Sequence, residues 1–338
     1  MFKKIICITC LILLSISAFA DRYAGDFMVI GAGVRSSGMG GAFSAIADDG
    51  SAIYWNASGI AQMRKSEVSL MRAFLYKDLA TYDNFTYCQP LPNEVTIGFN
   101  WTRLTIDDIP VFLEMHLVYN VDYRSSYHEY NLSAIPDGKI SSTDDLFQFA
   151  FAKHVQYNLN LGWLFFEIPF DIYLGGNIKY IKRKIDTSIG NGTGFDFSFI
   201  SRTKLSVLLE QDWLGDFSFG INFQDVGGTS ITWNVEDDNS DHTDEVMMNS
   251  KLGMAFHQPL DFINSSFVLS RDIDYIYDLI YHYGFEYRYK ELLGFRLGYS
   301  DTDFSTGLSL KLYDFTLDYA FITSVLANTN RIGLRFNF

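Results

Sequence analysis

The sequence predicts an all-β protein, a transmembrane antiparallel β-barrel of about fourteen strands with an N-terminal plug segment. Three observations carry this prediction. About 270 residues alternate polar and apolar side chains, and a stretch rich in Gly, Ala and Ser without alternation comes before them. Aromatic residues make up 17% of the chain, although the mean hydropathy is only +0.04. In a membrane barrel, lipid-facing apolar side chains alternate with lumen-facing polar ones, and aromatic residues gather at both interfaces.

The first twenty residues resemble a secretory signal peptide. Lys3 and Lys4 precede an apolar run from Ile5 to Ser17, and Ala18-Phe19-Ala20 forms a small-residue cleavage site. We therefore expect residues 1–20 to be removed, so that the mature protein begins at Asp21 and is exported to a Gram-negative-type outer membrane.

The barrel, residues 66–338, is predicted from period-two segments whose lengths are mostly close to those that cross a bilayer as tilted strands. Phe217–Gln224 and Tyr281–Lys290 show the alternation most clearly. The fourteen expected strands are 67–77, 81–90, 95–104, 146–155, 171–185, 194–209, 217–226, 246–257, 262–271, 280–290, 294–301, 304–312, 315–323 and 331–338.

The connections between these strands support the barrel. The long connections 105–145 and 227–245 follow odd-numbered strands, where external loops are expected, and the short turns follow even-numbered ones. Gln156–Phe170 is too long and too apolar for a turn, so we interpret it as a periplasmic insertion. A soluble β-sandwich is the alternative all-β fold, but the aromatic content, the loop parity and the aromatic last strand favour the barrel.

Residues 21–65 are predicted to form the plug, a segment packed inside the lumen. Glycine allows positive φ and close approach of backbones, and we expect this of Gly38, Gly40 and Gly41. A dinucleotide-binding turn is the alternative interpretation, but its third glycine is replaced by Ser36 and no βαβ unit surrounds it.

No set of residues indicates catalysis, so we expect no enzyme activity and no cofactor. The six His residues lack metal-binding spacing, and Cys88 is the one cysteine after the signal peptide, so we expect no metal site. The acidic loop Glu236–Glu245 offers oxygen ligands that suit calcium, but it lacks the EF-hand spacing and is better interpreted as a solvated loop. The net charge of −14 disfavours nucleic acid as a partner.

Charged side chains share the expected inner face of the last strands. Such groups either line a substrate path or pair with one another to fill the lumen, because a charge in a low dielectric needs a partner. The filling role is favoured. The residues are Glu286, Arg288, Arg296, Asp318, Arg331 and Arg335.

The segment GVRSSGMGGAFSAIADDGSAIYWNASGIAQM resembles the N-terminal signature of the PorV/PorQ family, within the FadL outer-membrane barrel superfamily. The last hairpin, FTLDYAFITSVLANTNRIGLRFNF, is also similar. The resemblance implies a fourteen-strand barrel and marks as plug residues Gly38, Gly40, Gly41, Asp48, Asp49, Trp55, Asn56 and Gly59. One departure is Asn56-Ala57-Ser58, where the family usually has Asn-Pro-Ala, so the local turn is expected to differ.

The resemblance implies two activities, and a purely structural or adhesive surface protein is a third possibility. Members of the PorV type serve protein secretion and surface attachment, whereas FadL-type members pass hydrophobic molecules. The charged inner face favours protein handling through an external loop, with secreted proteins or secretion-system components as partners. Its tyrosines resemble interface anchors, although an aromatic rim at the membrane surface explains them as well. They are Tyr119, Tyr123, Tyr127 and Tyr130.

The last residue, Phe338, ends an outward-facing aromatic pattern. Resemblance to other outer-membrane barrels implies that the barrel insertion machinery recognises it. The remaining expected partners are outer-membrane lipid and, in the transport alternative, hydrophobic small molecules.

Overall fold

The structure is a computed structural model that describes residues 25–111, 136, 138–160, 162, 167–234, 242–276, 278–301, 303–324 and 327–338. The signal peptide, the four tyrosines of the expected external loop and positions 236–241 of the acidic loop lie outside these residues.

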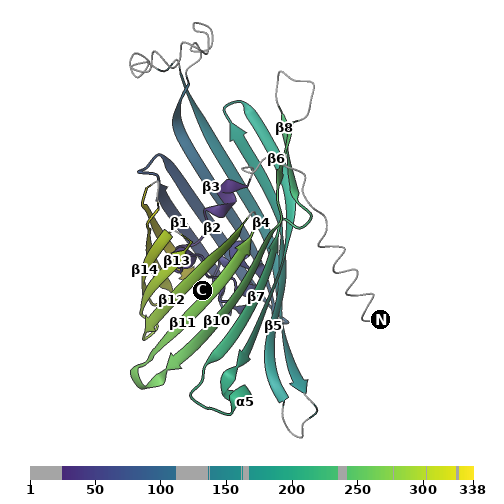
Figure 1. Ribbon diagram of the computed structural model, residues 1–338, viewed down its shortest axis with the longest axis vertical. Helices are drawn as coiled ribbons and strands as arrows, with labels where there is room; N and C mark the ends of the chain where they lie inside the picture. The colour runs from purple at the N-terminus through teal and green to yellow at the C-terminus, as the bar shows by residue number, and fades with distance from the viewer. Residues whose placement is uncertain are drawn as a thin grey trace, which may run out of the picture.

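Fourteen antiparallel strands form a closed ring, which confirms the predicted fold class (Figure 1). Each strand pairs with its neighbours along the chain, and β16 pairs with β1 to close the ring. The ring strands are β1 (Glu67–Leu75), β2 (Ala80–Leu91), β3 (Val95–Val111), β4 (Gly138–Asn160), β5 (Glu167–Ile185), β6 (Ser188–Lys204), β7 (Asp216–Gln224), β10 (Asn249–Leu260), β11 (Ser265–Tyr275), β12 (Leu279–Tyr289), β13 (Leu293–Ser300), β14 (Asp303–Leu312), β15 (Phe315–Ile322) and β16 (Thr329–Asn337).

The alternation in the sequence becomes an inner and an outer face of the ring, because successive side chains of a strand point to opposite faces. In β12, His282, Gly284 and Glu286 are buried toward the lumen, whereas Tyr281 and Tyr283 are exposed. The outer face carries exposed Leu, Ile, Phe and Tyr side chains around the ring, as a surface in contact with lipid requires.

Two hairpins extend beyond the ring. The segment Gln156–Phe170 is not a separate insertion as expected, because β4 and β5 continue through it and pair from Gln156↔Asp171 to Asn160↔Glu167. Hydrogen bonds between the backbones of β4 and β5 do not depend on contact with lipid. This hairpin therefore continues beyond the point where the alternation of apolar and polar side chains ends. At the opposite end, β8 (Thr229–Asn234) and β9 (His242–Val246) pair with each other, and β8 pairs with β6.

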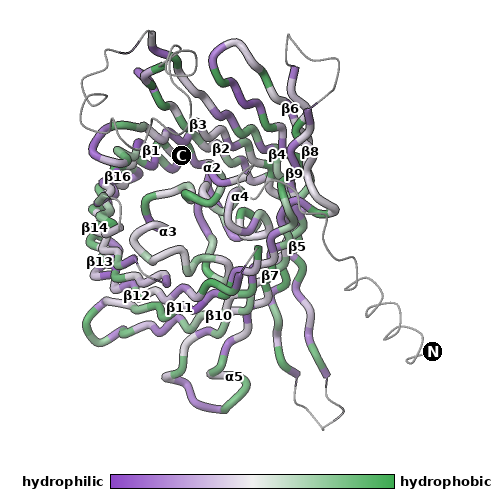
Figure 2. Tube along the Cα trace, turned by 45° about the horizontal axis from the view of Figure 1, so that its top comes forward, coloured by the Kyte–Doolittle hydropathy of each residue, from purple (hydrophilic) through white to green (hydrophobic). Residues whose placement is uncertain are grey.

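The plug segment lies inside the ring (Figure 2). It contains four short helices, α2 (Asp26–Val29), α3 (Val34–Gly38), α4 (Ala52–Trp55) and the 3₁₀ helix η1 (Ala57–Gln62). The side of the plug with α3 faces β13–β16, and η1 faces β3–β6. Two further short helices, α5 (Leu205–Leu209) and η5 (Asp261–Ile263), lie in turns between strands. None of the helices in the described ranges is long and apolar enough to cross a membrane.

Candidate functional site

On the side that faces β13 and β14, the plug touches the barrel wall backbone to backbone at two glycine contacts. A Cβ on Gly40 would lie 2.6 Å from the Tyr299 nitrogen, and a Cβ on Gly298 would lie 2.1 Å from the Gly40 nitrogen. Gly40 also has a φ of +64°, which side chains rarely allow. A Cβ on Gly38 would lie 3.2 Å from the Cα of Gly307. No side chain separates the plug from β13 and β14 at these points.

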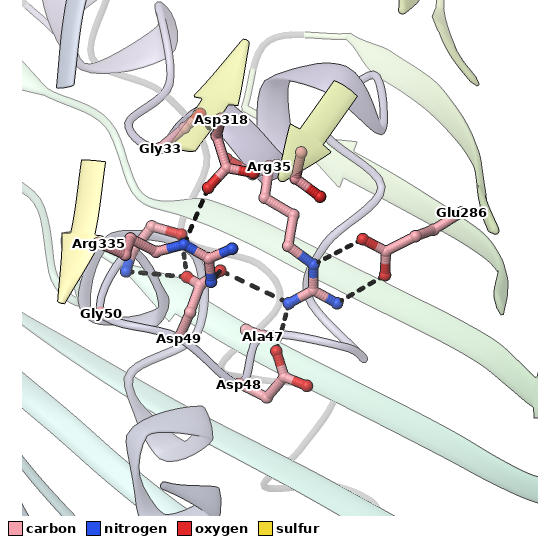
Figure 3. A network of polar contacts seen from close by, with 12 residues as sticks. Gly33, Arg35, Ala47, Asp48, Asp49, Gly50, Glu286, Asp318 and Arg335 are labelled. Carbon is pink, nitrogen blue, oxygen red and sulfur yellow. Dashed lines mark hydrogen bonds and ion pairs between the residues drawn. The ribbon is translucent and has the colours of Figure 1, made fainter. Parts of the chain in front are cut away.

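Arg35 of α3 binds one carboxylate of the wall, Glu286, and two of the plug itself, Asp48 and Asp49 (Figure 3). Its Nε and Nη2 each donate to one oxygen of Glu286 at 3.0 Å, so this contact is bidentate. Its Nη1 binds the carboxylate of Asp48 and lies 3.5 Å from Asp49. The side chain of Glu286 is fully buried, and that of Arg35 is nearly so.

The network continues along the wall. Arg296 contacts Glu286 at 2.7 Å and Asp318 at 3.0 Å. Arg335 contacts Asp318 at 3.0 Å and returns to Asp49 of the plug at 3.3 Å. With Arg288, which contacts Glu286 at 2.8 Å, the network balances four arginines against four carboxylates. We call these eight residues the plug lock: Arg35, Asp48, Asp49, Glu286, Arg288, Arg296, Asp318 and Arg335.

Arg35 and Asp48 of the plug are ionised at neutral pH. Burial opposes the charge of Asp48, but the guanidinium of Arg35 outweighs it and holds the pKa of Asp48 below its usual value. Burial also acts to lower the pKa of Arg35, but Asp48 and Glu286 outweigh this effect and raise that pKa well above its usual value.

Hydrogen bonds to the plug backbone hold the rest of the segment. Asp272 of β11 accepts from the Phe43 and Ser44 nitrogens at 2.9 and 2.6 Å. Asn222 of β7 donates to the Trp55 carbonyl at 2.7 Å. Arg331 of β16 donates to the Ile30 carbonyl at 2.7 Å and to that of Gly31 at 2.5 Å. The plug is therefore attached on several sides.

Two cavities lie on either side of α3. The inner cavity, of about 210 Å³, is lined by Arg35 and five other members of the plug lock, which are Asp48, Asp49, Arg288, Arg296 and Arg335. The outer cavity, of about 240 Å³, has an apolar part formed by Val29, Ile30, Trp55 and Leu75, together with polar groups that include Ser37 of α3. Because α3 contributes Arg35 to one cavity and Ser37 to the other, this helix separates them.

The structure brings most of the sequence-predicted residues together. Five of the six charges on the inner face belong to the plug lock, and Arg331 binds plug carbonyls instead. Asp48 and Asp49 lie in the lock, and Trp55 lines the outer cavity. Asn56 donates to the Ser44 carbonyl at 2.8 Å, and a Cβ on Gly59 would lie 2.0 Å from the Ala47 oxygen. Gly41 has a φ of +81°.

Other residues were missed at the sequence level. Arg35 stood in the quoted plug motif as a lone cation, which was a usable signal because a buried arginine requires carboxylates. Asp272 and His282 offered no comparable signal. His282 Nδ1 lies 2.7 Å from the Gly40 carbonyl, and this contact depends on which strand faces the plug.

Phe338 lies at one end of the seam between β1 and β16, directly after the last residue of β16. Its nitrogen donates to the Ser66 carbonyl at 2.9 Å, and its exposed ring stacks on Phe336 at 5.4 Å between centroids. Its role in assembly stays a prediction. Across the described ranges, no group of three or more His, Cys, Asp and Glu residues is arranged to hold a metal ion.

No protein-family model and no curated protein matches the chain. Solved structures share its fold. The toluene transporter TbuX of Ralstonia pickettii superposes with a TM-score of 0.51 at 12% identity, covering 91% of this chain and 98% of that one. The monoaromatic hydrocarbon channel CymD gives 0.53 at 10% identity, covering 91% and 98%.

The toluene transporter TodX of Pseudomonas putida gives a TM-score of 0.50 at 11% identity, covering 90% of this chain and 96% of that one. At such identities the likeness concerns the fold. It agrees with the barrel fold that the sequence resemblance implies and gives no support to the narrower PorV/PorQ part. The chain is similar in fold to these two toluene transporters and this hydrocarbon channel.

Proposed function

We propose that the protein is an outer-membrane channel for small hydrophobic molecules, closed by its plug in the arrangement described. The observation that carries this proposal is the outer cavity between the plug and β12–β16. A cavity of about 150 Å³ holds benzene in an engineered protein, so a volume of about 240 Å³ admits a molecule with one aromatic ring. Trp55 and Leu75 supply apolar contacts there.

The plug lock is the closing contact in this proposal. Passage from the outer to the inner cavity requires α3 to leave β13–β15, and Arg35 holds α3 in place. The inner cavity is polar, and a hydrophobic molecule gains little from it. The outer cavity is therefore the binding site, and the polar inner cavity is a place of transit.

The test is binding of toluene to the purified barrel, measured by equilibrium partition between buffer and protein. Ser300 at the end of β13 lines the outer cavity. Ser300→Trp fills the cavity and should abolish saturable binding, whereas the matched control Ser300→Ala should preserve it. Saturable binding that is equal in the two variants, or absent from the wild type, contradicts the proposal.

Protein secretion or surface attachment is the second candidate function. The charged inner face favours it, because a route for greasy molecules is expected to have an apolar wall, and so does the PorV/PorQ resemblance of the plug. Deleting residues 109–140 leaves β3 and β4 paired at Ile106↔Ser142, so the barrel should still fold. Loss of partner capture in this variant, with toluene binding absent from the wild type, would favour secretion.

A further inference from the structure

An open hollow of about 550 Å³ lies on the lipid-facing side of β7 and β10–β14. Figure 1 shows β10–β13 side by side on one wall of the barrel. Two rows of outward side chains form the hollow, and each row follows the register of the sheet. The first row is Met254, Arg271, Tyr283, Tyr299 and Phe304, and the second is Phe217, Phe256, Leu269, Phe285 and Leu297.

Arg271 is a charged residue in this otherwise largely apolar, lipid-facing surface. It is exposed on the outer face of β11, between the outward-facing Leu269 and Ile273. A cation on the lipid side of a membrane barrel costs about 2–4 kcal/mol at the bilayer midplane and less toward the interfaces. Its presence therefore requires a compensating partner.

The protein supplies only part of that compensation. The guanidinium lies 5.6 Å from the ring centres of both Tyr281 and Tyr283, and cation–π contacts of this kind stabilise the charge. No carboxylate among the described residues forms an ion pair with it. Arg72, on the outer face of β1, is different, because Asp83 accepts from its Nε and Nη2 at 2.7 and 2.8 Å.

The two rows are ordered like a lipid of the outer leaflet. β11 runs from its periplasmic end at Ser265 to its external end at Tyr275. Arg271 is therefore nearer the external surface, and the apolar row with Leu269 lies deeper in the membrane. In a lipid of the outer leaflet, the polar headgroup likewise lies nearer the external surface and the acyl chain lies deeper in the membrane.

We propose that this hollow binds one phosphate-bearing lipid of the outer membrane, with its phosphate on Arg271 and an acyl chain along the second row. Arginine presents several N–H donors in a planar fork that matches phosphate, and the cation–π contacts with Tyr281 and Tyr283 hold this fork in place. The apolar row gives the acyl chain a surface on the barrel. The site lies on the opposite face of the wall from the plug, and it is independent of any transport through the lumen.

The test is native mass spectrometry of the full-length mature protein in a neutral detergent, titrated with phosphatidic acid or with diacylglycerol of the same chains. The wild type should retain one phosphatidic acid more tightly than diacylglycerol. Arg271→Gln should weaken that binding on the order of ten-fold, as expected for loss of a charged hydrogen bond. The matched control Arg72→Gln should bind as the wild type does.

Two further variants keep the test decisive if Arg271→Gln fails to fold. Arg271→Lys keeps the charge and should bind, and Leu269→Trp keeps Arg271 but fills the hollow and should weaken binding. Equal binding of the two lipids by the wild type overturns the proposal, as does unchanged binding by Leu269→Trp. Oleate displacing phosphatidic acid at equal concentration would also overturn it, because the site would then select a fatty-acid carboxylate.

Discussion

At the scale of single residues, Glu286 is the carboxylate of the plug lock that contacts the most arginines. Its buried carboxylate is shared by Arg35, Arg296 and Arg288. Glu286→Gln leaves these cations undercompensated, and breaking a buried pair in this way costs about 3–5 kcal/mol. We expect the urea midpoint of the folded barrel, followed by heat-modifiable migration on gels, to fall clearly.

The matched control is Asp83→Asn, which removes a carboxylate that also binds an arginine by two contacts, but on the outer face. Partly exposed pairs contribute about 0–1 kcal/mol, so its midpoint should stay near that of the wild type. Equal losses in the two variants would show that burial does not set the strength of the plug lock.

The ion pair between Arg35 and Asp48 predicts a pH dependence. Because the pKa of Asp48 is lowered in the folded state, its stabilisation is fully present above the ordinary carboxyl pKa and is lost as the pH falls through the lowered value. Hydrogen exchange of the plug should therefore be unchanged between roughly pH 8 and pH 5 after correction for the intrinsic rate, and should increase only in stronger acid. Asp48→Asn should raise exchange throughout that range, and an equal plateau in this variant would contradict the prediction.

Gly40 predicts a steric effect that can be separated from backbone strain. Gly40→Ala introduces a Cβ 2.6 Å from the Tyr299 nitrogen at a φ of +64°, so the plug must move away from β13. Gly227 also has positive φ, +84°, but its Cβ would have no neighbour within 4 Å. Gly227→Ala should cost only the strain, about 1–3 kcal/mol, and the urea midpoint of Gly40→Ala should lie lower still.

At the scale of elements, the seam between β1 and β16 decides whether the ring closes. Deleting 335–338 removes three partners of β1, at Glu67, Val68 and Ser69, and it also removes the contacts of Arg335. We expect a protease-sensitive product without heat-modifiable migration. Phe338→Ala keeps the backbone bonds to Ser66, so it should fold in detergent but assemble poorly in cells. Normal assembly of this variant in cells would contradict a role for the aromatic side chain of Phe338 as an assembly signal.

Strands were predictable because each one has to satisfy lipid on one face and the lumen on the other. That requirement fixes the alternation, and all fourteen expected strands correspond to strands of the ring. The exception, Gln156–Phe170, belongs to a hairpin that extends past the ring, where no such two-sided requirement acts. Glu167 and Pro169 break the alternation there.

The plug lock was only half predictable. The polar inner face placed Glu286 and Arg296 together, since they lie opposite each other in neighbouring strands. Their pairing with Arg35 joins residues 251 positions apart and depends on how an irregular segment turns inside the ring. Period-two patterning carries no information about such a segment.

At the scale of the whole molecule, the barrel encloses a lumen with polar walls and the plug fills it. A variant lacking Asp26–Met63 keeps all fourteen ring strands, and the polar inner faces of β10–β16 would then contact water. Polar side chains of this kind line water-filled barrels. We expect this variant to conduct ions in planar bilayers far better than the intact protein, and equal conductance would contradict a sealing role for the plug.

The link between the plug and the seam has a consequence for the order of events during folding. Only Arg64, Lys65 and Ser66 separate Met63 from Glu67, the first residue of the strand that closes the ring. If the ring grows by pairing of strands that are neighbours in sequence, the β1–β16 pair forms last. The plug is therefore linked directly to β1, one of the two edges that pair in this last step. We expect docking of the plug on the concave sheet to precede closure, because afterwards its helices would have to thread through a ring already complete. Filling of the lumen by the plug and closure of the ring by β1 and β16 would then be two successive stages of one assembly step. In the first stage the plug would be the surface around which the open sheet curves.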